Sequence, residues 1–226
     1  MLKIEKYVTM SPEQWEIVIE GARNPMNSWD RMDSYKTHIE DPETLETADF
    51  EYFLGQNDYT LLSNLAGAGT SHSKYRRMMP VWVTLIAPLY WWKEFDTYKV
   101  GTVANSCSTM HKIHAKEFAL EDFSWERLDN LSIDNLEKTI SVLNMNREMF
   151  INYDNYKGGK PTKTELFDQM IQLLPSSYNQ KRTVKVNYEV LANIYKDRKN
   201  HKLPEWHVFC DWIKELPCSE LITGEA

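Results

Sequence analysis

The chain of 226 residues is long enough for one domain with a substantial core. Its 42% hydrophobic and 26% charged residues, with eight Trp and twelve Tyr, are typical of a folded protein and exclude a disordered chain. The net charge of −7 argues against general binding to nucleic acid or to anionic membranes, although it leaves room for a local cationic pocket.

The three cysteines and the apolar content indicate the compartment. Cys107, Cys210 and Cys218 are few and irregularly spaced, which fits free thiols in a reducing environment. No apolar run approaches the roughly 18 residues that span a bilayer, and the first residues lack the apolar segment of a signal peptide. We therefore expect a cytoplasmic protein without a membrane segment.

The first quarter of the chain carries a clear helix signal and then a long polar segment. Ser11 and Gln14 form a capping box, with proline at the first helical position and apolar residues at helical spacing after it. Residues 26–56 are polar with little periodicity, and we interpret them as a long excursion with local turns. Asp58 is expected to cap a second helix that stops at Gly67-Ala68-Gly69.

The rest of the chain alternates between strand and helix signals. Residues 81–86 are rich in β-formers and predict a buried strand, after which Pro88 can open a helix. A long helix is expected from Ser132, and residues 180–186 alternate as a short strand does. Three more helices are expected at 162–173, 187–199 and 204–216. With no repeat, low-complexity tract or linker, residues 1–226 predict one α+β domain.

Two local motifs carry candidate chemistry. The segment Ser71-His72-Ser73-Lys74-Tyr75-Arg76-Arg77 gathers hydroxyls, one histidine and three cations, as a phosphate or anionic cofactor requires. A solvated basic turn is the alternative interpretation. Trp91 and Trp92, with Tyr90 and Phe95, could stack on a planar ring or pack in the core.

Metal binding and thiol catalysis have little local support. His111 and His114 are spaced i, i+3, but no nearby cysteine or carboxylate completes a zinc pattern, so no metal is expected. Cys107 has no catalytic Cys–His signature around it. The glycine fingerprints of nucleotide-binding loops are also missing.

The stretch from residue 87 to 114 contains four pieces in a fixed order: Pro88-Leu89-Tyr90, Lys93-Glu94-Phe95, Thr97-Tyr98-Lys99 and Ser108. This order resembles the signature region of the flavin-dependent thymidylate synthase (ThyX) family. There, a Pro-aliphatic-aromatic turn leads into a helix with Arg/Lys-Gln-Trp/Phe, then Arg-His-Arg, seven residues and Ser. Ser108 matches that serine if one residue is inserted.

Matches outside this stretch support the resemblance. The turn at residues 71–74 corresponds to the family's Gly-His-Glu-Ser/Thr turn. Spacings between Pro175 and Arg198 match the closing region without a gap, and the resemblance covers about residues 72–212.

The departures from the family pattern remove positive charge. Thr97-Tyr98-Lys99 stands at the Arg-His-Arg position, and Met110, Ile171 and Glu189 stand where the family has arginines. Each lost charge-assisted contact is worth about 1.5–3 kcal/mol. Four basic residues elsewhere could compensate, namely Arg76, Arg77, Lys181 and Arg182.

The resemblance implies an α+β fold with a small antiparallel sheet packed with long helices, and a core over about residues 58–216. It implies a homotetramer with active sites between subunits. It also implies FAD and dUMP as ligands, methylene-tetrahydrofolate as the carbon donor and NADPH as the source of reducing equivalents.

The resemblance also assigns site positions. The implied catalytic positions are His72, Ser108 and Arg198. The implied cofactor-binding positions are Tyr98, Lys99, Asn187, Asn193 and His201. The implied substrate-binding positions are Glu94, Ser106, Ser108 and Arg198.

Two hypotheses follow. The chain is a ThyX relative that binds flavin and a pyrimidine nucleotide such as dUMP for reductive methylation or related chemistry. Alternatively, it is a catalytically inactive descendant that binds a nucleotide or a protein partner.

Overall fold

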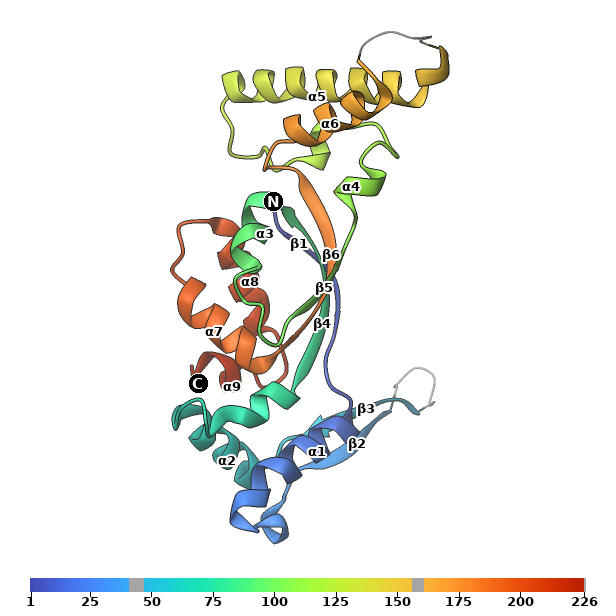
Figure 1. The fold of residues 1–226 in the computed structure, drawn as a ribbon. Coiled ribbons are helices and arrows are strands. Elements are labelled where there is room, and N and C mark those ends of the chain that lie inside the picture. Colours follow the sequence, from blue (N-terminus) through green and yellow to red (C-terminus); the bar gives the residue numbers. More distant parts are fainter. Residues whose placement is uncertain (41–46, 156–160, 226) are drawn as a thin grey trace. The chain divides into compact units, whose positions relative to one another are not determined.

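The described residues contain a four-stranded sheet (Figure 1). The computed structural model describes residues 1–40, 47–155 and 161–225. The sheet has the order β1-β4-β6-β5. Its strands are β1 (Lys3–Val8), β4 (Pro80–Pro88), β5 (Val103–Ser106) and β6 (Asn179–Asn187). The strands predicted at 81–86 and 180–186 are confirmed as parts of β4 and β6, and the α+β class is confirmed with them.

Strands β4 and β6 are antiparallel. At the start of β4, the Tyr188 amide donates to the carbonyl of Met79 at 3.0 Å. Beyond the end of β4, the Leu89 amide donates to the carbonyl of Tyr178 at 3.0 Å. The start of one strand therefore pairs with the end of the other, as two strands of opposite direction require.

The chain divides into two compact units. Unit 1 comprises Met1–Glu5, Thr84–Thr97 and Ala104–Thr183, and unit 2 comprises Lys6–Val83, Tyr98–Val103 and Val184–Ala226. The single domain expected over residues 1–226 stays a prediction. Among the helices of the described residues, none has the length and apolar content to cross a membrane.

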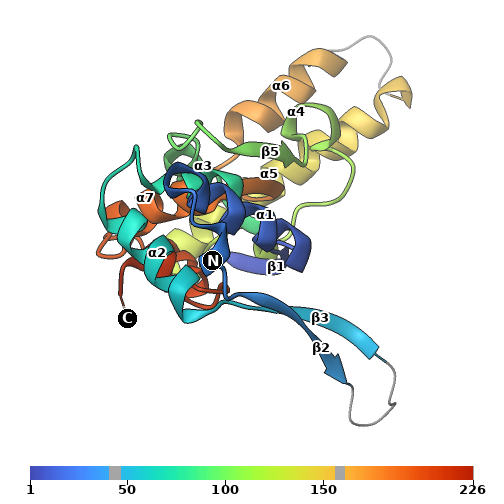
Figure 2. The ribbon, with the colours of Figure 1, turned by 90° about the horizontal axis from the view of Figure 1, so that it is seen from below.

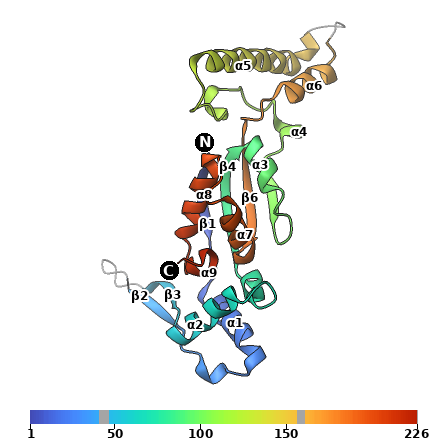
Figure 3. The ribbon, with the colours of Figure 1, turned by 90° about the vertical axis from the view of Figure 1, so that its left-hand side faces the viewer.

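Unit 1 is built around two long helices that lie side by side (Figures 1 and 3). Its helical segments are α3 (Leu89–Phe95), α4 (Thr109–Lys112), η4 (Leu120–Asp122), α5 (Asn130–Ile151), η5 (Tyr153–Asn155) and α6 (Lys163–Leu173). Helix α6 confirms the prediction for 162–173, and Thr162 forms its capping box with Glu165. Helix α5 begins two residues before the predicted start, because Asp129 accepts from the Ser132 amide at 2.8 Å and is the N-cap.

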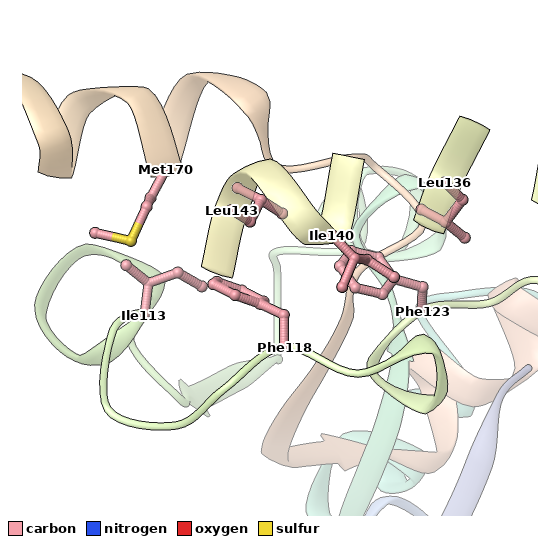
Figure 4. Packing of buried hydrophobic residues seen from close by; sticks show 7 residues of the cluster. All are labelled: Ile113, Phe118, Phe123, Leu136, Ile140, Leu143 and Met170. Atoms are coloured by element: carbon pink, nitrogen blue, oxygen red, sulfur yellow. The ribbon is translucent and has the colours of Figure 1, made fainter. Parts of the chain in front are cut away.

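The core of unit 1 lies under α5 (Figure 4). Leu136, Ile140 and Leu143 follow one another at helical spacing and point to the same side of α5. They pack with four buried residues from other segments, which are Ile113, Phe118, Phe123 and Met170. The periodicity seen in the sequence therefore marks the face of α5 that is removed from water.

The paired tryptophans of α3 are core residues. Trp91 and Trp92 are 0% and 1% exposed, and Phe95 packs against both rings. The Trp92 indole donates to the carbonyl of Gln180 at 2.9 Å, and the Arg182 guanidinium lies 4.3 Å from its ring centroid. Of the two interpretations of this pair, the structure supports packing in the core. Pro88 was expected at the first helical position but is the N-cap, since it is the last residue of β4.

Unit 2 combines an N-terminal and a C-terminal group of helices. Its helices are α1 (Pro12–Arg23), η1 (Asn24–Met26), η2 (Trp29–Arg31), α2 (Gln56–Gly67), η3 (Ser73–Met78), α7 (Tyr188–Arg198), α8 (Pro204–Lys214) and α9 (Glu220–Thr223). The Ser11–Gln14 capping box is confirmed, and so are the two helices predicted at 187–199 and 204–216. Figure 3 shows α7 and α8 beside each other.

The polar excursion predicted over 26–56 is wrong for part of its length. Strands β2 (Tyr35–Glu40) and β3 (Thr47–Phe53) form an antiparallel two-stranded sheet (Figure 2). Tyr35 pairs with Phe53, and their rings lie 5.0 Å apart. Pairing of this kind is made by backbone groups, so a polar composition does not prevent it. The stretch 41–46 lies outside the described residues.

The predicted cap of α2 is also wrong, because Gly55 is the N-cap residue. The first amides of α2 are instead capped by Asp33, whose carboxylate accepts from Asn57 at 2.9 Å and from Asp58 at 3.1 Å. The close approach of Asp33 explains the glycine, since a Cβ at Gly55 would lie 2.3 Å from that carboxylate. The predicted stop at Gly67-Ala68-Gly69 is confirmed, since Gly67 is the last residue of α2 and Ala68 its C-cap.

Candidate functional site

A cavity of about 900 Å³ in unit 2 is lined by the basic segment that the sequence singled out. Its basic side is formed by Ser71, His72, Lys74 and Arg77. The turn before this segment uses Gly69 at φ +98°, and η3 follows from Ser73. Tyr75 anchors η3 because its buried hydroxyl donates to the carbonyl of Leu62 at 2.8 Å. The segment is therefore anchored at Tyr75, while four of its exposed residues, Ser71, His72, Lys74 and Arg77, line the cavity.

The cations of this segment have two different roles. Arg76 lies 3.6 Å from the carboxylate of Glu189, and both side chains are largely shielded from solvent. Lys74 and Arg77 both line the cavity, and within the described part of the chain neither side chain has an ion-pair or hydrogen-bond partner. Unpaired cations beside a cavity attract an anion, and phosphate or carboxylate groups fit them best.

An apolar part of the lining, which we call the apolar wall, comes from α1, η1, α2 and η3. It is formed by Gly21, Ala22, Pro25, Met26 and Leu65, together with Met78 of η3. A volume of this size with few polar groups is typical of a site for an organic ligand. The ligand that fits has an anionic part and a larger weakly polar body.

A buried ion pair holds the end of α1, next to part of the apolar wall. Arg23, the last residue of α1, donates from Nε to Oδ1 of Asp58 at 2.6 Å, and both side chains are almost fully buried. Arg23 also donates to the carbonyls of Ser28 and Arg31, at 3.2 and 3.0 Å. These bonds hold the chain that follows α1, which includes Pro25 and Met26.

A second group in unit 2 surrounds Arg198, at the end of α7. Its guanidinium lies 4.9 Å from the ring centroid of Trp206 and 5.7 Å from that of Tyr98. Nε of Arg198 donates to the Tyr98 hydroxyl at 3.0 Å, and that hydroxyl donates to Asp197 at 3.3 Å. Burial raises the pKa of Tyr98, and the neighbouring Arg198 only partly offsets this increase. The arginine is thus held by protein groups on several sides.

The turn that carries Tyr98 and Lys99 packs closely on Asn187. Gly101 has φ +85°, and a Cβ there would lie 2.8 Å from Nδ2 of Asn187 and 3.2 Å from Val190. Asn187 is buried and caps α7 by accepting from the Val190 amide at 3.0 Å. The turn after Tyr98 and Lys99 therefore lies against Asn187, so three positions that the resemblance assigns to the cofactor are close in the fold.

Gly101→Ala is expected to lower the free energy of unfolding by about 1–3 kcal/mol, because alanine is strained at positive φ. The displacement of Asn187 by the added Cβ should lower it further. Gly69→Ala is the matched control, since Gly69 also has positive φ but nothing lies within 4 Å of its added Cβ. Thermal unfolding of both variants separates backbone strain from the lost contact. Equal destabilisation by the two changes would contradict the packing role of Gly101.

Unit 1 contains another cavity, of about 520 Å³, beside α4. Ser108 lines it and caps α4, its Oγ accepting from the His111 amide at 3.1 Å. The other lining residues are Ile86, Cys107, Thr109, Lys112, Ile113, Lys116, Phe118, Glu121, Asp122, Tyr178, Asn179, Gln180 and Lys181. We call this the α4 cavity, and the cavity of unit 2 the η3 cavity.

Two solved structures are similar to this chain over nearly its whole length. Both are flavin-dependent thymidylate synthases (ThyX) from Helicobacter pylori, and both contain FAD and dUMP. The first has a TM-score of 0.62 and the second 0.59, each at 13% identity and each covering 99% of this chain. The match covers 97% and 98% of those chains. The chain has the fold of a flavin-dependent thymidylate synthase.

The ThyX fold confirms the architecture that the resemblance implied. No protein-family model matches the chain, and no curated protein sequence matches it either. At 13% identity the likeness shows the fold alone. The roles of individual residues therefore depend on the geometry of this chain.

The structure distributes the implied ThyX site residues between the two units. Those in unit 2 are His72, Tyr98, Lys99, Asn187, Asn193, Arg198 and His201, and those in unit 1 are Glu94, Ser106 and Ser108. Tyr98 and Arg198 are in direct contact, and His201 packs on the Trp206 ring that Arg198 also contacts. His72 lines the η3 cavity and Ser108 the α4 cavity, whereas exposed Asn193 and Ser106 line neither.

Several residues at these sites were not found from the sequence. Pro25 and Met26 fell at the edge of the segment interpreted as an excursion, and Met78 lay outside the basic motif. Lys112 lies in none of the motifs identified in the sequence. Within the described residues, no three His, Cys, Asp or Glu side chains gather as metal ligands.

Proposed function

We propose that this protein binds a flavin nucleotide and a pyrimidine nucleotide and carries out flavin-dependent chemistry on the pyrimidine, either reductive methylation or a related reaction. The observation that carries the proposal is the η3 cavity, whose lining joins an apolar wall to Lys74 and Arg77, two cations without a partner among the described residues. The full-length ThyX fold supports it, since the similar solved structures contain FAD and dUMP.

The residues of the η3 cavity fit an anionic cofactor with a large ring system. Lys74 and Arg77 would hold its phosphates, and His72 lines the same cavity. The apolar wall would cover the weakly polar body of the cofactor. The flavin, when bound, would supply the redox chemistry, while the protein would hold it and exclude water.

The pyrimidine nucleotide is placed by this proposal in the α4 cavity, with Ser108 as a donor to it. Glu94, Ser106 and Arg198 complete the substrate side by resemblance, and Tyr98, Lys99, Asn187, Asn193 and His201 the cofactor side. Methylation would require methylene-tetrahydrofolate and NADPH as well. A cytoplasmic homotetramer belongs to the same proposal.

The second candidate is a protein that binds nucleotides without catalysis. The observation that favours it is the engagement of basic residues within the protein. Arg76 is paired with Glu189, Arg182 with Asp96, and Arg198 with Tyr98 and Trp206. Of the four basic residues that could compensate for the lost arginines, Lys181 is also paired, with Glu5, which leaves Arg77 unpaired among the described residues.

The visible absorbance of the purified protein tests the proposal. We expect the flavin spectrum to be present as isolated, or after incubation with FAD and removal of the excess. NADPH should bleach it, because reduction of the flavin abolishes the oxidised spectrum. A protein that takes up no flavin under either condition would refute the flavoprotein proposal. A stable spectrum that NADPH does not change in the presence of dUMP would favour the non-catalytic candidate.

A further inference from the structure

The charged residues of the α4 cavity are mostly neutralised in pairs. Lys116 bonds the carboxylate of Asp122, and Lys181 lies 2.5 Å from the carboxylate of Glu5. Lys112 lines the same cavity, and no ion-pair or hydrogen-bond partner is found for its side chain among the described residues. Lys112 is therefore the lysine of this lining whose charge is available to a ligand.

One hydrogen-bonding side chain of the same lining is available to a ligand and another is already engaged. Ser108 uses its Oγ as an acceptor for the His111 amide, so its hydroxyl proton can be donated to a ligand. Gln180, by contrast, is fixed, because it donates to the carbonyl of Cys107 at 2.7 Å and accepts from Arg182 at 2.9 Å. A cation and a hydroxyl donor on one lining suit a phosphate oxygen better than a neutral group.

The rest of the lining indicates what else the ligand carries. Ile86, Ile113 and Phe118 form an apolar part that suits one face of a planar ring. Glu121 also lines the cavity and has no recorded partner among the described residues, so its carboxylate can accept from an N–H group of the ligand. A pyrimidine nucleotide such as dUMP has all three features: an anion, a planar ring and a ring N–H group.

We infer that Lys112 is the cation that holds the phosphate of the nucleotide in the α4 cavity. This inference rests on the proposed function, because it takes the pyrimidine nucleotide as the occupant. It adds a named contact for the phosphate, which is the group that distinguishes a nucleotide from a nucleoside. The loss of one charge-assisted contact of about 1.5 kcal/mol corresponds to roughly tenfold in affinity.

The thiol of Cys107 provides a local measure of occupancy, since it lines the cavity and is exposed. Burial raises the pKa of Cys210 to about 11 and that of Cys218 to about 12. Both are therefore protonated and slow to react at neutral pH. The rate of Cys107 alkylation by iodoacetamide, followed by mass spectrometry of the labelled peptide, reports ligand binding with or without catalytic turnover.

In the wild-type protein, dUMP is expected to slow alkylation of Cys107 at lower concentration than deoxyuridine. Lys112→Met should raise the half-protecting concentration of dUMP about tenfold or more and leave that of deoxyuridine unchanged. Lys112→Arg should retain most of the protection. Lys138→Met, which removes an exposed lysine of α5 outside the cavity lining, is the matched control. Inorganic phosphate should compete with dUMP and lose that ability in Lys112→Met.

Equal protection of wild type and Lys112→Met by dUMP would overturn the inference, and so would an equal loss of protection by deoxyuridine. Absence of protection by any of these ligands would overturn it too. These outcomes remain distinct from failure of the proposed function, because flavin uptake is measured separately by absorbance and depends on the η3 cavity.

Discussion

Asp58→Asn is expected to lower the free energy of unfolding by about 3–5 kcal/mol, the range found when one partner of a buried ion pair is removed. Asp58 is 0% exposed, and its carboxylate accepts from Arg23 at 2.6 Å and from the Ser34 amide at 2.9 Å. The variant leaves the Arg23 guanidinium, which is 3% exposed, without its counter-charge. Chemical denaturation at neutral pH measures the change.

The acid stability of the protein is expected to depend on the same carboxylate. Burial by itself would raise the pKa of Asp58, but hydrogen bonds from Ser34, Asp33 and Arg23 outweigh it, and the pKa is lowered. A carboxyl with a lowered pKa in the folded state stabilises the protein above its unfolded pKa of about 4. That contribution is lost as the pH falls through the folded pKa. The free energy of unfolding of Asp58→Asn should therefore decrease less steeply than that of the wild type as the pH is lowered.

A double substitution separates the ion pair from the rest of the network. Arg23→Met with Asp58→Asn removes both charges, so we expect it to be less destabilising than the sum of the single changes. Additive effects would contradict coupling between the two side chains. Asp134→Asn, at an exposed position of α5 in unit 1, controls for the loss of a carboxylate as such.

Loss of this network should also affect the candidate site, because Arg23 donates to the carbonyls of Ser28 and Arg31. The chain between α1 and those carbonyls contributes Pro25 and Met26 to the η3 cavity. Loosening the network should weaken flavin retention at temperatures where the variant is still folded.

The parts of the fold that the sequence predicted depend on contacts within a few residues. Ser11 and Gln14 form their capping box within one turn, and Leu136, Ile140 and Leu143 repeat at helical spacing. Hydrophobic periodicity and capping are local signals, so a single sequence carries them. The basic segment at 71–77 was found for the same reason, since its charges are adjacent in the chain.

The parts that were missed depend on residues far apart in the sequence. Asp33 caps a helix that begins more than twenty residues later, and β2 pairs with β3 although neither strand has a strong apolar alternation. Whether a cation is paired also depends on residues far away in the chain. Arg76 lies beside Glu189 of α7, whereas its neighbour Arg77 lines a cavity. Composition shows that a charge is present, but only the fold decides whether it is neutralised or available to a ligand.

Replacing Lys74 and Arg77 together by alanine is expected to weaken flavin binding about a hundredfold. Each cation is exposed and unpaired among the described residues, so we assign each the lower value of about 1.5 kcal/mol for a charge-assisted contact. Their removal leaves the apolar wall and the Tyr75 anchor in place, so the free energy of unfolding should change little. Equilibrium titration with FAD, followed by flavin fluorescence, measures the affinity.

The control for this change must remove the same charge elsewhere. Lys6 and Lys138 are exposed and lie outside the lining of the η3 cavity, so Lys6→Ala with Lys138→Ala should bind FAD as the wild type does. Arg77→Lys keeps the charge but loses the paired donors of the guanidinium, and it should fall between wild type and the double variant. Added salt should weaken the wild type more than the double variant, because the contacts removed are electrostatic. Unchanged affinity in the Lys74 and Arg77 double variant would mean that the flavin phosphates lie elsewhere. The chain would then have the ThyX fold without the flavin site proposed in the η3 cavity.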